Sequence, residues 1–284
     1  MQDRVTARVA EAIEPSLRLA ETNRLRRAPT ASLNAYDMYL KALAEIQAFT
    51  RESMVRAEGG LREAIKLDPN YSDAFATLAN TAFLRNVAGW LGREEAQAIG
   101  VEVALTAVRL DPGNASAQAT AAATLALLSN SHDRAIEFAD QALSLNRNSA
   151  QVLTFSALAY NFSAMGQKAL PLLHLARRID PLDPRGYMIL NQITTAHFFA
   201  REFDDALAWA NRTIDEYPNF PPARRFRAAS LAHLGRMDQA QTAIAELLRL
   251  QPNSNSRLSR LTSYRYPWMI DLYIEGLRLA GLPE

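Results

Sequence analysis

The chain has 284 residues, which is enough for one large or two small domains with a sizeable buried core. Hydrophobic residues make up 49% and charged residues 21%, proportions that exclude disorder as the main state. The net charge of +1 gives no general attraction to nucleic acid or membranes, and the absence of cysteine excludes disulfides, thiol catalysis and thiolate metal sites. Since the sequence also has no membrane-length apolar run and no secretory signal pattern, we expect a cytoplasmic protein.

Residues 1–29 begin with an amphipathic pattern. Val5, Val9 and Ile13 are four residues apart, which is the spacing of one face of a helix. Pro15 would cost roughly 3 kcal/mol inside a continuous helix, so a kink or a new helix is expected there. We predict an N-terminal connector whose first apolar residues are less buried than those after Pro15, and which joins the chain to an effector domain before it.

A turn marked by proline recurs through residues 30–252. The marker positions are Pro69, Pro112, Arg147, Pro181, Pro218 and Pro252, at separations of 43, 35, 34, 37 and 34 residues. Twelve positions before five of these markers the chain has Ala57, Ala135, Ala169, Ala206 and Ala240. A small residue at this position would let the second helix of each unit approach the first closely.

This pattern resembles the tetratricopeptide repeat (TPR), a helix–turn–helix unit of about 34 residues. The resemblance covers most of the chain and implies an all-α fold, a right-handed superhelical solenoid of about six helical hairpins. One hairpin cannot bury its own apolar face, so neighbours stack into a continuous core. The second unit is about nine residues too long, and we place the excess at residues 86–95. Aromatic residues of the later units are expected in the core: Tyr160, Phe162, Phe198, Phe199, Phe203, Trp209 and Phe226.

The first helix of each repeat lines the concave face in this family, which defines a candidate groove for a protein or peptide partner. The groove residues are Ala76, Asn80, Phe83, Ala119, Ala123, Thr154, Leu158, Asn161, Asn191, Thr195, Phe198, Arg225, Ala229 and His233. This set is mostly small, apolar or neutral, which favours an extended or helical peptide. A related subset of these repeats clamps C-terminal carboxylates with Lys and Asn, but no Lys accompanies Asn80. The small residues of 115–128 leave room either for a partner segment or for a tightly curved stack.

Residues 253–284 follow the last marker and lose the repeat pattern. One short helix and then an apolar-rich helix are expected there, and they would cover the open end of the stack as capping helices do. The alternative is that this end binds a partner.

No catalytic constellation has a specific spacing in the sequence. A phosphate-binding glycine motif is absent, and the four histidines, His132, His174, His197 and His233, form no pair on one helix face. We therefore predict no enzyme activity, no catalytic residue, no cofactor and no metal.

Three basic clusters interrupt this neutral pattern. Two of them end predicted helices, where cations are favoured: Arg24, Arg26 and Arg27, and then Arg177 and Arg178. The third, Arg224, Arg225 and Arg227, begins a helix. It is interpreted as solvated surface, with contact to an anionic partner as the alternative.

The two ends of the chain extend the comparison. The segments QDRVTARVAEAIEP, RRAPTASLNAYDMYLKAL and YIEGLRLAGLPE resemble the C-terminal half of bacterial multidomain signalling proteins. In that group a class III adenylate cyclase domain, or a winged-helix DNA-binding domain, precedes a TPR region. The resemblance implies a regulatory or sensory module for which a cyclase catalytic domain is one candidate partner. No catalytic position carries over, and no direct nucleic-acid or membrane contact is expected. The alternatives are a trans-acting regulatory subunit of a cyclase and the effector-sensing part of a transcriptional regulator.

Overall fold

The computed structural model describes residues 30, 32–181, 186–256 and 263–284. Thirteen α-helices lie wholly within these ranges, and the described residues contain no strand. The predicted connector, residues 1–29, lies outside them. In the part of the chain described, no helix combines the length and the apolar character that crossing a membrane requires.

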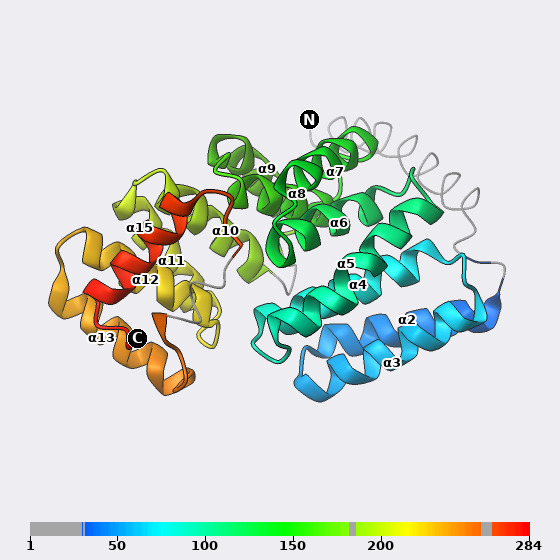
Figure 1. The fold of residues 1–284 in the computed structure, drawn as a ribbon, viewed down its shortest axis with the longest axis horizontal. Coiled ribbons are helices and arrows are strands. Elements are labelled where there is room, and N and C mark those ends of the chain that lie inside the picture. The colour runs from blue at the N-terminus through cyan, green and yellow to red at the C-terminus, as the bar shows by residue number, and fades with distance from the viewer. Residues whose placement is uncertain (1–29, 31, 182–185, 257–262) are drawn as a thin grey trace, which may run out of the picture.

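Twelve of the helices pack as six consecutive hairpins, which confirms the predicted all-α solenoid (Figure 1). The pairs are α2 (Leu33–Ala48) with α3 (Arg51–Leu67), α4 (Ser72–Val87) with α5 (Arg93–Leu110), α6 (Ala115–Leu128) with α7 (His132–Leu145), α8 (Ala150–Phe162) with α9 (Gly166–Ile179), α10 (Gly186–Phe199) with α11 (Phe203–Glu216), and α12 (Pro221–His233) with α13 (Met237–Leu250). The last described helix, α15 (Pro267–Leu279), packs on α12.

The marker prolines end the second helix of their hairpins. Pro69 follows α3 and Pro112 follows α5, each one residue after the C-cap. Proline cannot continue a helix, because it lacks the backbone N–H and its ring clashes with the preceding turn. In the third hairpin Arg147 occupies the same place after α7, where Asn146 is the C-cap.

The five predicted alanines lie in the second helices and are fully buried. The second hairpin has Gly100 at the equivalent place on α5, where an added Cβ would lie 3.4 Å from Leu128 and 3.5 Å from Thr124. The excess length of this hairpin falls in a turn at 88–92 and in α5, which has 18 residues. The requirement for a small residue is therefore met in all six hairpins.

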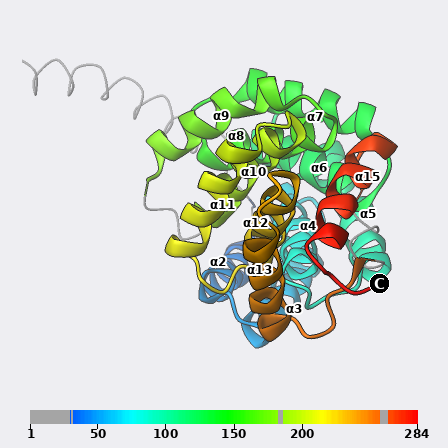
Figure 2. The same ribbon diagram turned by 90° about the vertical axis from the view of Figure 1, so that its left-hand side faces the viewer.

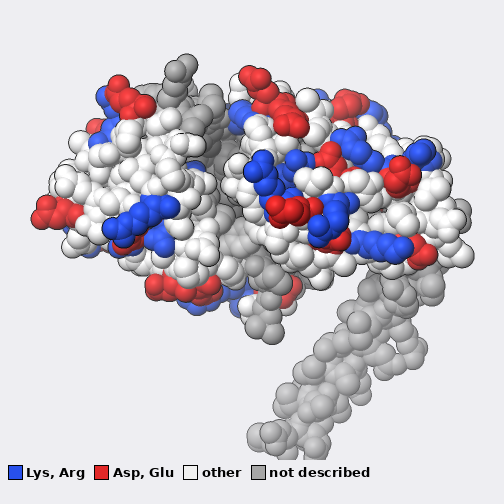
Figure 3. All heavy atoms as spheres, turned by 90° about the horizontal axis from the view of Figure 1, so that it is seen from below, with Lys and Arg blue, Asp and Glu red and all other residues white. Residues whose placement is uncertain are grey.

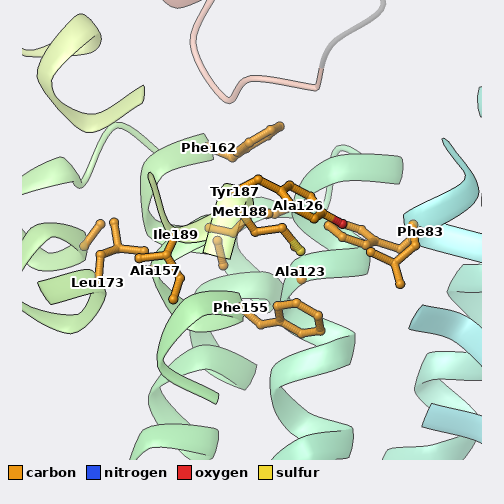
Figure 4. Close-up of a cluster of buried hydrophobic side chains, with 14 of the residues drawn as sticks. Phe83, Ala123, Ala126, Phe155, Ala157, Phe162, Leu173, Tyr187, Met188 and Ile189 are labelled. Carbon is orange, nitrogen blue, oxygen red and sulfur yellow. The ribbon is translucent and has the colours of Figure 1, made fainter. Parts of the chain in front are cut away.

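Helix α6 decides between the two interpretations of its small residues. Twelve of its 14 residues are buried, because it packs on α4, α5, α7 and α8. Figure 4 shows Ala123 and Ala126 of α6 among Phe83 of α4 and Phe155 of α8, whose rings are 5.7 Å apart. The small residues therefore serve a tight stack. The aromatic residues predicted for the core are buried or packed against it.

The curvature brings distant hairpins into contact (Figures 1 and 2). The ring of Phe49, which follows α2, lies 5.3 Å from Trp90 in the second hairpin. It also lies 5.8 Å from Tyr187 at the start of α10. The first hairpin therefore reaches the fifth.

Residues 263–266, called here the crossing segment, pass over the solenoid to its third and fourth hairpins. Ser263 Oγ donates to the carbonyl of Ser129 and lies 2.9 Å from Asn130 Oδ1. The backbone N–H of Arg265 donates to the carbonyl of Phe162, and the Arg265 side chain pairs with Asp133 at 2.8 Å. The last element of the chain is thus tied to helices more than a hundred residues earlier.

Candidate functional site

A cavity of about 350 Å³, called here the central cavity, lies between the first helices of the solenoid. Its walls come from α4, α6, α8, α10 and α12, from the 88–92 turn and from the start of α5. Gln251, Tyr264 and Tyr273 add residues from the C-terminal part. Six aromatic side chains line it: Phe83, Phe162, Phe220, Phe226, Tyr264 and Tyr273. Its volume is within the range of pockets that hold small molecules.

Two arginines line the central cavity, and no carboxylate does. Arg225 donates from Nη2 to Gln251 Oε1 at 2.7 Å, and Arg93 donates from Nη1 to the carbonyl of Leu127 at 2.7 Å. Burial lowers the pKa of Arg93. Among the described residues neither guanidinium has a carboxylate partner, so the cavity carries uncompensated positive charge.

Neutral polar groups complete the wall. Asn191 is 8% exposed, and its Oδ1 has no hydrogen-bond partner among the described residues. Burial raises the pKa of Tyr264 and of Tyr273, with Arg225 opposing the rise in both, so both phenols stay protonated at neutral pH. The cavity therefore offers cations, O–H donors and, at Asn191, an amide oxygen that has no partner among the described residues.

A second depression of about 220 Å³, called here the Trp268 groove, lies where the start of α9, the end of α10 and α15 meet. Its lining contains no charged residue: Asn161, Ala164, Gly166, Gln167, Leu170, Thr195, Ala196, Phe199, Ala200 and Trp268. Trp268 is 42% exposed, and its ring lies 6.0 Å from that of Phe199.

The structure brings together part of the predicted groove. Five predicted residues line the central cavity: Phe83, Leu158, Asn191, Thr195 and Arg225. Asn161 and Thr195 line the Trp268 groove. The others line neither depression: Ala76, Asn80, Ala119, Ala123, Thr154, Phe198, Ala229 and His233.

Close packing accounts for the residues outside the two depressions. Ala119 and Phe198 are fully buried, and Ala76 packs with Ala107 and Ala117 between neighbouring hairpins. His233 Nε2 bonds the carbonyl of Leu272 in α15 at 2.9 Å. At these four positions the chain's own helices supply the contacts.

Sequence reasoning missed Arg93, Gln251, Tyr264, Trp268 and Tyr273. None of them belongs to a first helix of a hairpin, so the repeat phase gives no signal for them. Arg93 enters the central cavity from the start of α5, whereas the other four reach the two depressions because the C-terminal part folds back over the solenoid.

The third basic cluster divides between two environments. Arg224 and Arg227 pair with Glu246 at 2.8 and 3.0 Å, whereas Arg225 lines the central cavity. On the face seen in Figure 3, blue and red side chains lie side by side over much of the surface. Two of the three arginines therefore share one acidic partner within the chain itself.

One group in the described part of the chain has the side-chain types and spacing that a metal ion could use. His197, Glu202 and Asp205 bring their ligand atoms within 4.8 Å of one another at the turn between α10 and α11. His197 Nδ1 lies 2.6 Å from Glu202 Oε2, and both carboxylates are exposed. The hydrogen bond between His197 and Glu202 ties the turn to α10.

Six stacked hairpins, small residues at the helix crossings and prolines after the second helices define a TPR-type α-solenoid. No protein-family model and no curated protein sequence matches the chain.

Solved structures with this fold are similar to the chain at low identity. The human IFIT1 dimer with m7Gppp-AAAA is 17% identical over 86% of this chain and 58% of its own, with a TM-score of 0.63. Cut9 in the APC/C hetero-tetramer Cut9–Hcn1 is 15% identical over 92% of this chain, with a TM-score of 0.60, and the match spans 46% of that chain. The type IV pilus biogenesis factor PilW is 19% identical over 74% of this chain and 88% of its own, with a TM-score of 0.53. At these identities the likeness shows the fold.

Proposed function

We propose that the chain is a non-catalytic protein-interaction module that holds an apolar segment of a partner protein in the Trp268 groove. The observation that carries this proposal is an uncharged groove with a tryptophan left 42% exposed at its edge. Tryptophan is enriched among the residues that dominate binding energy at protein interfaces.

The shape and chemistry of the groove indicate what it would take. Leu170, Ala196 and Phe199 offer apolar surface, while Asn161 and Gln167 can bond a peptide backbone. Its volume suits one or two apolar side chains of a peptide rather than a whole domain. The neutral lining agrees with the peptide partner expected from the sequence.

The solved structures support the general class. Cut9 has a similar fold and occurs in an assembly with a second protein, Hcn1. Presentation of side chains from stacked hairpins along an extended surface is the general use of such solenoids.

Selection of peptides from a displayed library of random 12-residue sequences tests the proposal. The immobilised chain should enrich a consensus with an apolar anchor, and the enriched peptide is then titrated by fluorescence polarisation. Trp268→Ala should weaken binding at least tenfold, as loss of an interface anchor does.

Trp209→Ala is the matched control. Trp209 lies on α11 under Arg177 and Arg212 and does not line the groove, so its replacement should change the affinity less than twofold. The proposal fails if no peptide is enriched, or if the two variants weaken binding equally.

We further propose the signalling context implied by the two ends of the chain, in which the module regulates a class III cyclase catalytic domain. As a module it should form no cyclic AMP when incubated with ATP and Mg²⁺ or Mn²⁺. Measurable cyclic AMP would contradict the non-catalytic assignment.

A further inference from the structure

We propose that the central cavity is a binding site for a small aromatic molecule that carries one carboxylate or phosphate group. This site shares only Thr195 with the lining of the Trp268 groove, and the inference does not depend on the function proposed for that groove.

Charge gives the first argument. Arg93 and Arg225 enter the cavity from α5 and α12, and the lining contains no aspartate or glutamate. A partly buried cation without a counter-charge is costly, because its hydration is reduced and no ion pair compensates for the loss. An anion in the cavity would supply the missing partner.

The two arginines lie toward the same turn of the second hairpin. Gln251 Oε1 accepts from Arg225, while Gln251 Nε2 lies 3.6 Å from the position of a Cβ added to Gly89. Gly89 lies within the 88–92 turn, and Arg93 begins α5 directly after it. The acidic group of the ligand is therefore placed at this end of the cavity, where Arg225 can bind it through two N–H donors.

The remaining wall defines the rest of the ligand. Phe162, Phe226 and Tyr264 offer ring faces and edges that favour a flat, unsaturated molecule. Asn191 Oδ1 has no hydrogen-bond partner in the described part of the chain, so a ligand hydroxyl or N–H would satisfy it. At roughly 30 Å³ per water, the cavity has room for about a dozen waters or a bicyclic aromatic acid.

A fluorescent probe tests the site directly. The full chain is titrated with 8-anilinonaphthalene-1-sulfonate, an aromatic anion, and the bound probe is displaced with 2-naphthoate, 2-naphthyl phosphate or the neutral 2-naphthamide. We expect saturable binding of one probe per chain and displacement by both anions at concentrations at least tenfold lower than by 2-naphthamide. Whichever anion binds more tightly identifies the acidic group that the cavity prefers.

Two variants on one helix separate the cavity from the surface. Arg225→Gln should weaken binding of 2-naphthoate at least tenfold and leave 2-naphthamide almost unchanged, whereas Arg227→Gln, whose partner is Glu246, should change neither more than twofold. Circular dichroism verifies folding, and Arg93→Gln is the second variant if Arg225→Gln does not fold. Trp268→Ala should retain binding, because Trp268 does not line this cavity.

Three results would overturn the inference. The first is an absence of saturable probe binding, and the second is equal displacement of the probe by the neutral and the anionic competitors. The third is an equal effect of Arg225→Gln and Arg227→Gln on the binding of 2-naphthoate.

Discussion

His132 is the first residue of α7 and is buried with both ring nitrogens lacking a hydrogen-bond partner among the described residues. Burial lowers its pKa, the nearby Arg265 lowers it further, and Asp133 opposes the shift. The crossing segment thus places a cation beside a histidine that the fold keeps neutral.

This environment predicts a loss of stability in acid. Above the ordinary histidine pKa of about 6.5 the ring is neutral in both the folded and the unfolded chain, so it does not lower the free energy of unfolding. As the pH falls below that value the unfolded chain gains a proton that the folded chain resists, so the free energy of unfolding decreases by at most about 1.4 kcal/mol per pH unit. Urea unfolding at pH 7.5 and pH 5.5 should therefore show a smaller acid loss for His132→Gln than for the wild type. Equal losses in the two proteins would contradict this explanation.

The third basic cluster shows what the sequence can and cannot predict about single residues. Arg224, Arg225 and Arg227 are indistinguishable as a basic cluster in the sequence. Only the fold shows that two of them pair with Glu246 while Arg225 lines the cavity. The different environments of the three arginines depend on Glu246 in α13 and on Gln251 after it. The repeat pattern does not predict which residues of α12 these two contact.

At the scale of the elements, the helices and their order were predictable, because each hairpin repeats the same local requirements. A proline or its substitute ends the second helix, and a small residue allows the crossing. Gly100 falls outside the alanine pattern, although glycine meets the requirement for a small residue equally well. The groove was predicted only in part, because α6, α8 and α10 are buried on nearly every side.

Gly276 of α15 allows this helix to pack closely on α12. A Cβ on Gly276 would lie 2.8 Å from His233 Nε2 and 2.9 Å from Ala229 Cβ. Gly276→Ala should therefore decrease the free energy of unfolding by about 1–3 kcal/mol, the usual cost of overpacking. Denaturant unfolding measures this change.

Gly59→Ala is the matched control for that measurement. Gly59 is exposed in the interior of α3, and an added Cβ meets nothing within 4 Å. Alanine there should stabilise the protein by roughly 0.5–1 kcal/mol, because it reduces the backbone entropy of the unfolded chain. If both variants changed the free energy of unfolding in the same direction, the close crossing of α12 and α15 would not explain the effect of Gly276→Ala.

At the scale of the whole molecule, the solenoid closes on itself. The first hairpin touches the fifth through Phe49 and Tyr187, and the crossing segment joins the C-terminal part to the third and fourth hairpins. A repeat pattern specifies contacts between neighbouring units, so it contains no information on these long-range contacts. Both depressions depend on this closure, since Tyr264 lines one and Trp268 the other.

Disulfide trapping tests this closure most directly, because the natural chain has no cysteine. Ser263 and Asn130 are 133 residues apart in the sequence, with Ser263 Oγ 2.9 Å from Asn130 Oδ1. The variant Asn130→Cys with Ser263→Cys should form an intramolecular disulfide under mild oxidation and migrate faster on a non-reducing gel. Ser144→Cys with Ser263→Cys, which uses an exposed position on α7, should remain reduced. Failure of the first pair to cross-link, or equal cross-linking of both pairs, would contradict the closed solenoid.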